Sequence, residues 1–211
     1  MPVISVLQSK GGVGKTTLAV HIARGLQLRG HSTILIDADK QGSSYQWSKS
    51  GEDTPFTVSA ETPQGIRSIL KKADAKGDTG DTYVVIDGAA HLKVLDAAII
   101  QYSDVLLIPI QPSPVDVWAT KDIVRLAHER EDLRAAFVLS RRKAGTRLSS
   151  VITDVLQQFD LPVLSGTHDR VAYQMVMGKG RSVEESQDSK AASEVEDIIS
   201  FCLNGHASSL S

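Results

Sequence analysis

The stretch SKGGVGKTT, at positions 9–17, has the residue types that a phosphate-binding loop requires. Lys15 can reach the β and γ oxygens of a nucleotide, and the hydroxyl of Thr16 can coordinate Mg²⁺. Three glycines place no side chain between the backbone and a ligand, so successive N–H groups can surround phosphate oxygens. These glycines are Gly11, Gly12 and Gly14. The stretch therefore predicts a nucleoside triphosphate site.

The loop differs from the pattern G-x-x-x-x-G-K-[ST] in two ways. Ser9 stands where the pattern has its first glycine, and Lys10 adds a second lysine before Lys15. Two lysines on one small loop repel each other unless each has its own anionic partner. Lys10 is therefore expected to meet negative charge other than the phosphates that Lys15 holds.

Acidic residues follow two apolar runs that resemble buried strands. The run YVVI leads to Asp87, and the run ILI leads to Asp37, with Asp39 two positions later. Side chains alternate along a strand, so Asp37 and Asp39 are expected on one side, facing the same bound phosphate. Asp87 stands at the usual place of a carboxylate that organises Mg²⁺.

Short apolar runs alternate with helix-period segments along the chain. Strands are expected at 3–7, 33–36, 83–86, 105–108 and 135–139. Gly30 indicates the end of a helix, and Thr62-Pro63 and Ser113-Pro114 indicate two helix starts. This alternation predicts a single-domain α/β fold of the P-loop NTPase class, with a mostly parallel twisted sheet and helices on both faces.

The composition is that of one globular domain. The 211 residues are 41% hydrophobic and 23% charged, with a formal net charge of −2, so a nucleic acid or membrane partner would need a local basic patch. The single Cys202 predicts a reducing compartment, the cytoplasm. The sequence has neither a signal-peptide pattern nor a run of 18 apolar residues. We expect one domain over 1–203 and a flexible tail over 204–211.

Three motifs together resemble the ParA/MinD family of partitioning ATPases, and most closely its small members without an N-terminal DNA-binding domain. They are the deviant Walker A motif at 10–17, the Asp37-Ala-Asp39 turn of switch I, and the segment DGAA at 87–90, which is similar to switch II and Walker B. The likeness covers nearly the full length, including IPIQPSP at 108–114. It implies ATP or ADP and Mg²⁺ as ligands.

The resemblance implies a catalytic set of three residues. Lys10 matches the signature lysine, which crosses a dimer interface and touches the ATP held by the other subunit. Such a cation would stabilise charge on the transferred phosphoryl group, as an arginine finger does. Lys15 holds the phosphates of its own subunit, and Asp39 positions the attacking water. Lys40 departs from the family, which usually has proline at this place.

The resemblance also implies the ligands of the metal and the nucleotide. Asp87 organises Mg²⁺ through water, Asp37 supports the metal shell, and Thr16 coordinates the ion. Nucleotide contacts are implied for Lys10, Gly11, Gly12, Val13, Gly14, Lys15, Thr16, Thr17, Ser140 and Arg141. Ser140 is only a weak match to the adenine-contacting position of relatives.

Basic residues cluster after the expected strand at 135–139. The segment SRRKAGTRLSS, at 140–150, has four basic residues and no acidic one. Clustered Arg and Lys on loops suit sequence-independent contact with DNA phosphates. The candidate DNA-binding residues are Arg141, Arg142, Lys143, Arg147, Arg170, Lys179 and Arg181. The alternative is a basic loop that only interacts with solvent.

The C-terminal segment argues against a membrane partner. Val195 and Ile198 belong to an apolar stripe that predicts a helix packed on the sheet. Glu194, Glu196 and Asp197 make the expected exposed face acidic, and an anionic leaflet would repel that face.

The interpretation that unites these features is a Mg²⁺-dependent ATPase that closes into an ATP-sandwich homodimer and binds nonspecific DNA in that state. By resemblance, a partner of the ParB-like or cargo-linking type stimulates slow hydrolysis, and the protein is cytoplasmic and nucleoid-associated. The cargo would be plasmid DNA, a chromosomal locus, or a protein assembly such as a carboxysome or a chemoreceptor cluster. The alternative of another class is a metabolic enzyme similar to dethiobiotin synthetase.

Overall fold

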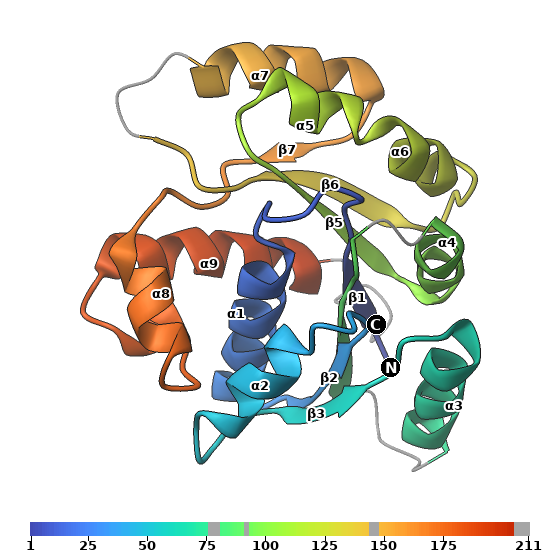
Figure 1. Ribbon diagram of the computed structural model, residues 1–211, viewed down its shortest axis with the longest axis vertical. Coiled ribbons are helices and arrows are strands. Elements are labelled where there is room, and N and C mark those ends of the chain that lie inside the picture. The colour runs from blue at the N-terminus through green and yellow to red at the C-terminus, as the bar shows by residue number, and fades with distance from the viewer. Residues whose placement is uncertain (76–80, 91–92, 144–147, 205–211) are drawn as a thin grey trace.

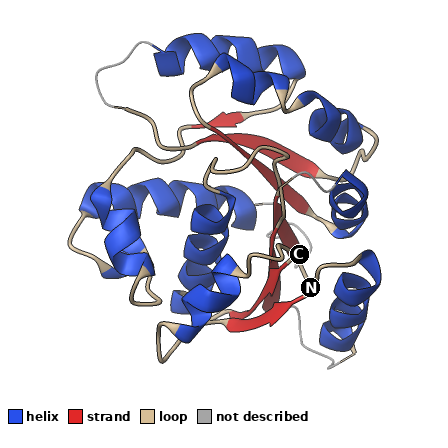
Figure 2. Cartoon of the chain, in the orientation of Figure 1, coloured by secondary structure: helices blue, strands red, loops and turns tan. Residues whose placement is uncertain are grey.

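The computed structural model describes residues 1–75, 81–90, 93–143 and 148–204. A parallel seven-stranded sheet runs through its middle in the order β3-β2-β4-β1-β5-β6-β7, with helices on both sides (Figures 1 and 2). The strands are β1 (Val3–Val6), β2 (Ser32–Asp37), β3 (Phe56–Ser59), β4 (Thr82–Asp87), β5 (Val105–Ile110), β6 (Arg134–Leu139) and β7 (Val163–Leu164). The predicted single α/β domain is confirmed.

Two helical layers cover the sheet (Figure 1). One layer contains α1 (Lys15–Leu28), α2 (Ser43–Lys49), α8 (Val171–Met177) and α9 (Ser189–Leu203), with the 3₁₀ turn η2 (Val183–Glu185). The other contains α3 (Pro63–Asp74), α4 (Lys93–Tyr102), α5 (Pro114–Trp118), α6 (Lys121–His128) and α7 (Leu148–Leu156), with η1 (Gln157–Phe159). Among the described residues, none of the helices has the length and apolar character that a membrane span needs.

The central strands are apolar along their whole length because both of their faces are covered. In β4, Val84 and Ile86 pack into the core beneath α3 and α4, whereas Tyr83 and Val85 pack into the core beneath α1 and α9. This alternation follows from the two-residue period of a strand. It fixes the register of β4, because a slip of one residue would exchange the two cores.

The sequence pattern located the interior strands and missed the two edges. The five predicted strands correspond to β1, β2, β4, β5 and β6, which are buried at nearly every position. Strands β3 and β7 were missed because they are short and only partly buried, so they show no long apolar run. At the helix starts, Thr62 accepts a hydrogen bond from the Gly65 N–H, as predicted, but Ser113 makes no side-chain cap. Residues 205–211 of the predicted tail lie outside the described residues.

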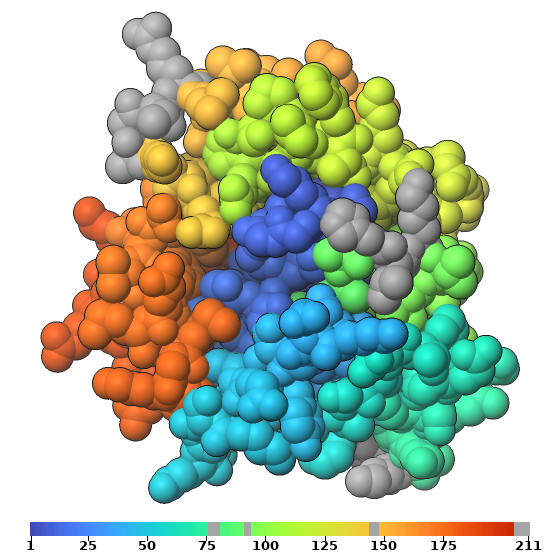
Figure 3. Space-filling model, in the orientation of Figure 1, coloured from blue at the N-terminus to red at the C-terminus, as the bar shows by residue number. Residues whose placement is uncertain are grey.

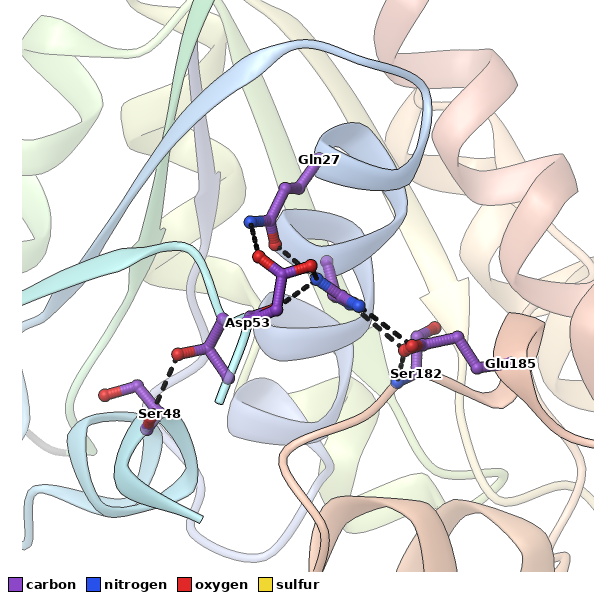
Figure 4. A network of polar contacts seen from close by, with 7 residues as sticks. Gln27, Ser48, Asp53, Ser182 and Glu185 are labelled. Atoms are coloured by element: carbon purple, nitrogen blue, oxygen red, sulfur yellow. Dashed lines mark hydrogen bonds and ion pairs between the residues drawn. The ribbon is translucent and has the colours of Figure 1, made fainter. Parts of the chain in front are cut away.

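Helix α1, which starts at the phosphate loop, is fixed by an ionic network around Arg24. Figure 4 labels its partners Gln27, Asp53 and Glu185. The guanidinium donates to both carboxylate oxygens of Glu185, at 3.1 and 2.9 Å, and to Gln27 at 2.8 Å. It also donates to Asp53 in the segment between α2 and β3. Ser182 and Glu185 form a capping box at η2. The network therefore joins α1 to two segments that are distant in the sequence.

Gly166 follows β7 and sets the path of the chain into the segment 167–170. Its φ of +63° lies in the left-handed region, and a Cβ at this position would lie 1.8 Å from the backbone oxygen of Leu139. The next residue, Thr167, donates its N–H to that same oxygen at 2.8 Å. No side chain can fit here unless β6 and β7 separate.

We expect Gly166→Ala to lower the free energy of unfolding by more than about 2 kcal/mol, because backbone strain of about 1 kcal/mol is added to a clash with a rigid backbone. Gly42→Ala is the matched control. Gly42 has a φ of +64° and open space around its Cβ position, so it isolates the strain. Urea unfolding of both variants measures the difference. Equal losses would show that the contact with Leu139 costs nothing.

Candidate functional site

The phosphate loop connects the end of β1 to the start of α1. Gly12 and Gly14 have φ angles of +75° and +99°, which side chains disfavour, so the loop needs glycine at both positions. Helix α1 begins at Lys15, and Gly14 as its N-cap offers no side chain to occupy the first N–H groups. These groups and the positive end of the helix dipole make an anion site.

A pocket of about 370 Å³ opens on this loop. In Figure 3 the loop, in blue, lies at the centre of one face, with later segments of the chain around it. Of the predicted site residues, the pocket is lined by Gly11, Gly12, Gly14, Lys15, Thr16, Thr17, Asp39, Ser140, Arg141 and Arg170. The pattern missed the rest of the lining, which includes Gln41, Ser43, Thr167, His168, Asp169, Tyr173 and Gln174. The pocket has room for a nucleotide beside the loop.

Lys15 is the buried cation of the site, with 7% of its surface exposed. Its Nζ donates to the backbone oxygen of Lys10 at 3.1 Å, across the loop. Burial lowers the pKa of Lys15, and the charges of Asp87, Asp39 and Asp96 oppose this shift. A phosphate in the pocket would oppose it further, because an anion favours the protonated amine.

Asp87, the last residue of β4, lies behind the loop with no exposed surface. Neither of its carboxylate oxygens has a hydrogen-bond partner among the described residues. Burial raises the pKa of Asp87 to about 7, and the charge of Asp37 adds to the shift. The hydroxyls of Thr16 and Ser44 and the charge of Lys15 favour the carboxylate, although neither hydroxyl meets the geometry of a hydrogen bond.

These residues fit a magnesium ion that is held mainly by nucleotide and water oxygens. Mg²⁺ takes hard oxygen ligands and keeps several waters, so a protein commonly supplies one or two groups. Thr16 offers a hydroxyl at the pocket, and Asp87 offers two oxygens that have no hydrogen-bond partner in the part of the chain that the structure describes. The described residues contain no cluster of three or more His, Cys, Asp or Glu that would hold a metal without a nucleotide.

The two carboxylates of switch I differ in their surroundings, contrary to the expectation that both face the phosphate. Strand β2 ends at Asp37, which is fully buried and accepts the N–H of Asp39 at 3.1 Å and the N–H of Tyr45 at 2.8 Å. Asp39 lies beyond the strand and lines the pocket. The alternation argument does not reach Asp39, because the pairing with β4 ends at Ala38, whose N–H donates to the Asp87 oxygen at 3.0 Å, and the chain bends at Asp39. The part of Asp37 in the metal shell stays a prediction.

The switch I turn is held by carboxylates although it lacks the proline of relatives. Asp39 accepts the N–H of Gln41 at 3.0 Å through its side chain and the N–H of Gly42 at 3.0 Å through its backbone. Lys40 is exposed at this turn. Successive Asx turns therefore restrict the backbone where proline would otherwise do so.

Lys10 meets an anion within its own subunit. Its Nζ forms an ion pair with Asp116 of α5, a residue with no exposed surface, and the Lys10 side chain is 37% exposed. Asp116 also accepts the N–H of Gln111 at 3.2 Å. The family resemblance implies that Lys10 meets the triphosphate of another subunit, and this contact stays a prediction. The partner that the structure shows is Asp116, which the motif did not indicate.

The wall opposite the phosphate loop depends on Glu194 of α9. This carboxylate accepts hydrogen bonds from Arg170 at 2.7 Å, from the His168 N–H at 3.0 Å and from the Tyr173 hydroxyl at 2.9 Å. Its side chain is 11% exposed, so the prediction that Glu194 lies on the exposed face of α9 is wrong. Hydrogen bonds from three neighbouring residues hold the Glu194 carboxylate against the pocket wall.

The predicted basic residues have different surroundings. Arg170 is paired with Glu194, and Arg141 lines the pocket with its Nε 3.7 Å from Asp169. Arg142 is half-buried, and its backbone pairs with His168. Lys143, Lys179 and Arg181 are exposed, and Arg147 lies outside the described residues. The binding of DNA by these residues stays a prediction.

Two of the residues with implied nucleotide contacts, Val13 and Ser140, form a buried hydrogen bond that supports the phosphate loop. Val13 is buried, and its backbone oxygen accepts the hydroxyl of Ser140 at 2.5 Å. Ser140 is 1% exposed and follows β6. It therefore supports the phosphate loop from the end of β6, which is separated from β1 by β5.

Glu194 is expected to make the stability of the protein depend on pH. Partial burial raises the pKa of Glu194, but the hydrogen bonds from Arg170, His168 and Tyr173 lower it by more. The pKa of Glu194 is therefore lowered to about 2. The unfolded chain binds this proton nearer the ordinary value of 4.5, so stability is present above that pH and is lost as the pH falls towards 2.

We expect Glu194→Gln to lower the free energy of unfolding by about 1–3 kcal/mol at pH 7, because a charged acceptor with several donors is lost. The difference from wild type should narrow as the pH falls from about 5 to about 2, because the unfolded chain takes up the Glu194 proton near 4.5 and the folded chain only near 2. Melting curves across this range measure it. Glu196→Gln, which changes a half-exposed carboxylate of the same helix, is the control. A difference that is constant with pH would contradict the assignment.

Comparisons with known proteins identify the family of this chain. The family of the CobQ/CobB/MinD/ParA nucleotide binding domain matches residues 4–183. Protein ParA of Rhizobium radiobacter is 32% identical over 219 residues, which cover 96% of this chain and 95% of the relative. Maintenance of carboxysome distribution protein A of Halothiobacillus neapolitanus is 27% identical over 208 residues, with 93% and 94% covered.

The likeness extends to the fold of solved structures. The apo McdA of Cyanothece superposes with a TM-score of 0.75 at 15% identity, and the superposition covers 95% of this chain and 99% of that one. At this identity the structure supports the fold alone, and the family match rests on the sequence. The chain therefore belongs to the CobQ/CobB/MinD/ParA nucleotide-binding domain family, and its fold is that of the ParA and MinD P-loop proteins.

Proposed function

We propose that the protein is a Mg²⁺-dependent ATPase that forms an ATP-sandwich homodimer, binds nonspecific DNA and positions a cargo. The observation that carries the proposal is the phosphate-loop pocket, with Asp87 behind it, whose two carboxylate oxygens have no hydrogen-bond partner among the residues described. An anion site at a helix start, beside a buried cation and carboxylates for a metal, is the arrangement that phosphoryl transfer uses.

Each residue of the pocket has a defined part in this reaction. The backbone N–H groups of the loop and Lys15 hold the triphosphate and stabilise charge on its oxygens. Mg²⁺, held by Thr16 and through water by Asp87, would neutralise the developing charge. Asp39 lines the pocket and has one carboxylate oxygen without a backbone bond, so it can orient the attacking water.

The proposed homodimer depends on Lys10. Its Nζ must leave Asp116 to reach the triphosphate of another subunit, so closure exchanges one ion pair for another. Asp116 is fully buried, and a buried carboxylate without a cation is unfavourable. The exchange is favourable only when the incoming triphosphate offers Lys10 more negative charge than Asp116 does. ATP binding would thus control dimer formation.

The relatives support a positioning role. One is named Protein ParA and another a carboxysome distribution protein, and both match over nearly their whole length. We propose the same class of work for this chain, in the cytoplasm and on the nucleoid, with plasmid DNA or another assembly as cargo. A ParB-like or cargo-linking partner would stimulate hydrolysis, which ends the dimeric state and releases the DNA.

We expect the hydrolysis-blocked variant Asp39→Ala to be dimeric with Mg²⁺ and ATP, and Asp39→Ala with Lys10→Ala to be monomeric. Lys10→Ala alone should abolish turnover and keep nucleotide binding, because Lys15 and the loop remain. Sedimentation velocity measures the mass, and phosphate release measures turnover. Lys40→Ala, the loss of an exposed lysine at switch I, is the control and should leave the dimer intact.

Melting temperatures show whether Lys10→Ala still folds, since it also deprives Asp116 of its cation. A strictly monomeric ATP-bound Asp39→Ala protein would overturn the dimer. A stand-alone phosphotransferase would then be the better interpretation, because that class needs the pocket and no second subunit.

DNA binding is tested separately with exposed basic residues, because Arg141 and Arg170 line the pocket. We expect retention of nonspecific duplex DNA only with ATP. Changing Lys143, Lys179 and Arg181 to alanine should weaken it and make the log–log salt slope shallower by about 2–3. The matched control changes three exposed lysines of the other helical layer, Lys71, Lys72 and Lys121. Equal effects of both triple variants, or no retention of DNA by wild type, would contradict the proposal.

A further inference from the structure

A second hollow of about 390 Å³ lies between α4 and α6, and we call it the α4–α6 groove. Ala97 of α4 and Ile123 and Leu126 of α6 form its apolar walls, and Ser9 and Ala119 lie along it. It shares no lining residue with the nucleotide pocket. It touches the phosphate loop at Ser9, whose side chain is the first of the loop motif.

Asp96 is the polar group of this groove. It lies in the first turn of α4 and is 5% exposed, and its Oδ1 is buried without a hydrogen-bond partner among the described residues. Burial raises the pKa of Asp96 to about 6, and the charge of Lys15 partly opposes this shift. Buried carboxylates are normally hydrogen-bonded or paired, so a carboxylate that lines a groove without a partner indicates a missing ligand.

The other charged side chains of the groove are already engaged. Asp122 adds a second acid to the lining and has a polar interaction of its own. Arg125 also lines it, but its guanidinium is paired with Glu129 at 2.5 Å, one turn along α6, so its charge is offset. The described residues hold no cluster of acids that could bind a metal ion here. An organic cation is thus the better match.

The apolar walls specify the kind of cation. A lysine or arginine side chain places its aliphatic stem along apolar surface and its charged head on an acid. Val94, at the start of α4, is 80% exposed and lines the same groove, so the rim is apolar as well. A segment with aliphatic residues on both sides of a basic one would cover this rim and pair Asp96.

We propose that the α4–α6 groove is the docking site for a segment of a partner protein that carries an arginine or lysine between aliphatic residues. The basic side chain pairs with Asp96, and the aliphatic neighbours cover Val94, Ile123 and Leu126. The site is separate from the nucleotide pocket, and its test requires neither nucleotide nor DNA. Failure of the ATPase proposal would therefore leave this one standing, and the reverse also holds.

Ser9 gives the docked segment a position from which it contacts the phosphate loop. The Ser9 hydroxyl donates to the backbone oxygen of Ala119 at 3.1 Å and to the Gln8 side chain at 3.3 Å. Ala119 and Ser9 both line the groove. An occupant of the groove would thus contact the first residue of the loop motif directly.

The test uses two acetylated and amidated pentapeptides, Ala-Leu-Arg-Leu-Ala and the same peptide with citrulline for arginine. Citrulline keeps the shape of arginine and removes its charge. Each is titrated into the full chain without nucleotide, and amide chemical shifts are followed by NMR. We expect saturable shifts at Ser9, Ala97 and Ala119 with the arginine peptide, and binding weaker by about tenfold with the citrulline peptide, because a charge-assisted pair is lost.

The variant Asp96→Asn should reduce the binding of the arginine peptide to that of the citrulline peptide. Asp197→Asn, which changes an exposed acid of α9, is the matched control and should change nothing. No saturable shift with either peptide, equal binding of the two, or unchanged binding to Asp96→Asn would overturn the proposal. The comparison of peptides uses the unmodified chain, so it remains decisive even if Asp96→Asn alters the fold.

Discussion

The balance of charge around Lys15 is the constraint on which the rest of the site depends. One buried cation faces Asp39, Asp87 and Asp96, and burial raises the pKa of the last two carboxylates. A triphosphate adds several negative charges to this group, so it can enter only if the backbone N–H groups of the loop and a divalent cation compensate them. The requirement for magnesium in the proposed reaction follows from this excess of acid.

The architecture creates this concentration of charge. In a parallel sheet, the carboxyl ends of all strands lie at one edge, so β1, β2 and β4 deliver the phosphate loop, Asp37 and Asp87 to the same place. Asp37 and Asp87 are directly opposite in the register of β2 and β4. The oxygens of Asp37 accept backbone N–H groups, whereas those of Asp87 have no hydrogen-bond partner within residues 1–75, 81–90, 93–143 and 148–204. At the same position of the sheet, the carboxylate of β2 thus stabilises the backbone, and the carboxylate of β4 is left for a ligand.

Local features of the sequence were enough to predict the sheet interior and the phosphate loop. The buried strands have long apolar runs. The glycines and Lys15 of the phosphate loop are close together in the sequence, so their spacing alone predicts what they do. Glu194 could not be predicted in the same way, because its donors come from a different segment, 168–173, that no spacing relates to α9. The ion pair of Lys10 with Asp116 joins residues 106 positions apart. Edge strands β3 and β7 have too little buried surface to show a pattern.

Three contacts join the phosphate loop to the segment 111–119, and they suggest how the two proposed sites relate. The side chain of Gln111 donates to the Gly12 oxygen at 2.8 Å, Asp116 pairs with Lys10, and the Ala119 oxygen accepts the Ser9 hydroxyl. A contiguous set of contacts transmits a change only when one member has two arrangements. In the proposed cycle Lys10 is that member, because it pairs either with Asp116 or with the triphosphate of another subunit. A segment docked beside Ala119 would then favour one of these states, and by linkage the nucleotide-bound dimer would change the affinity for that segment by the same factor.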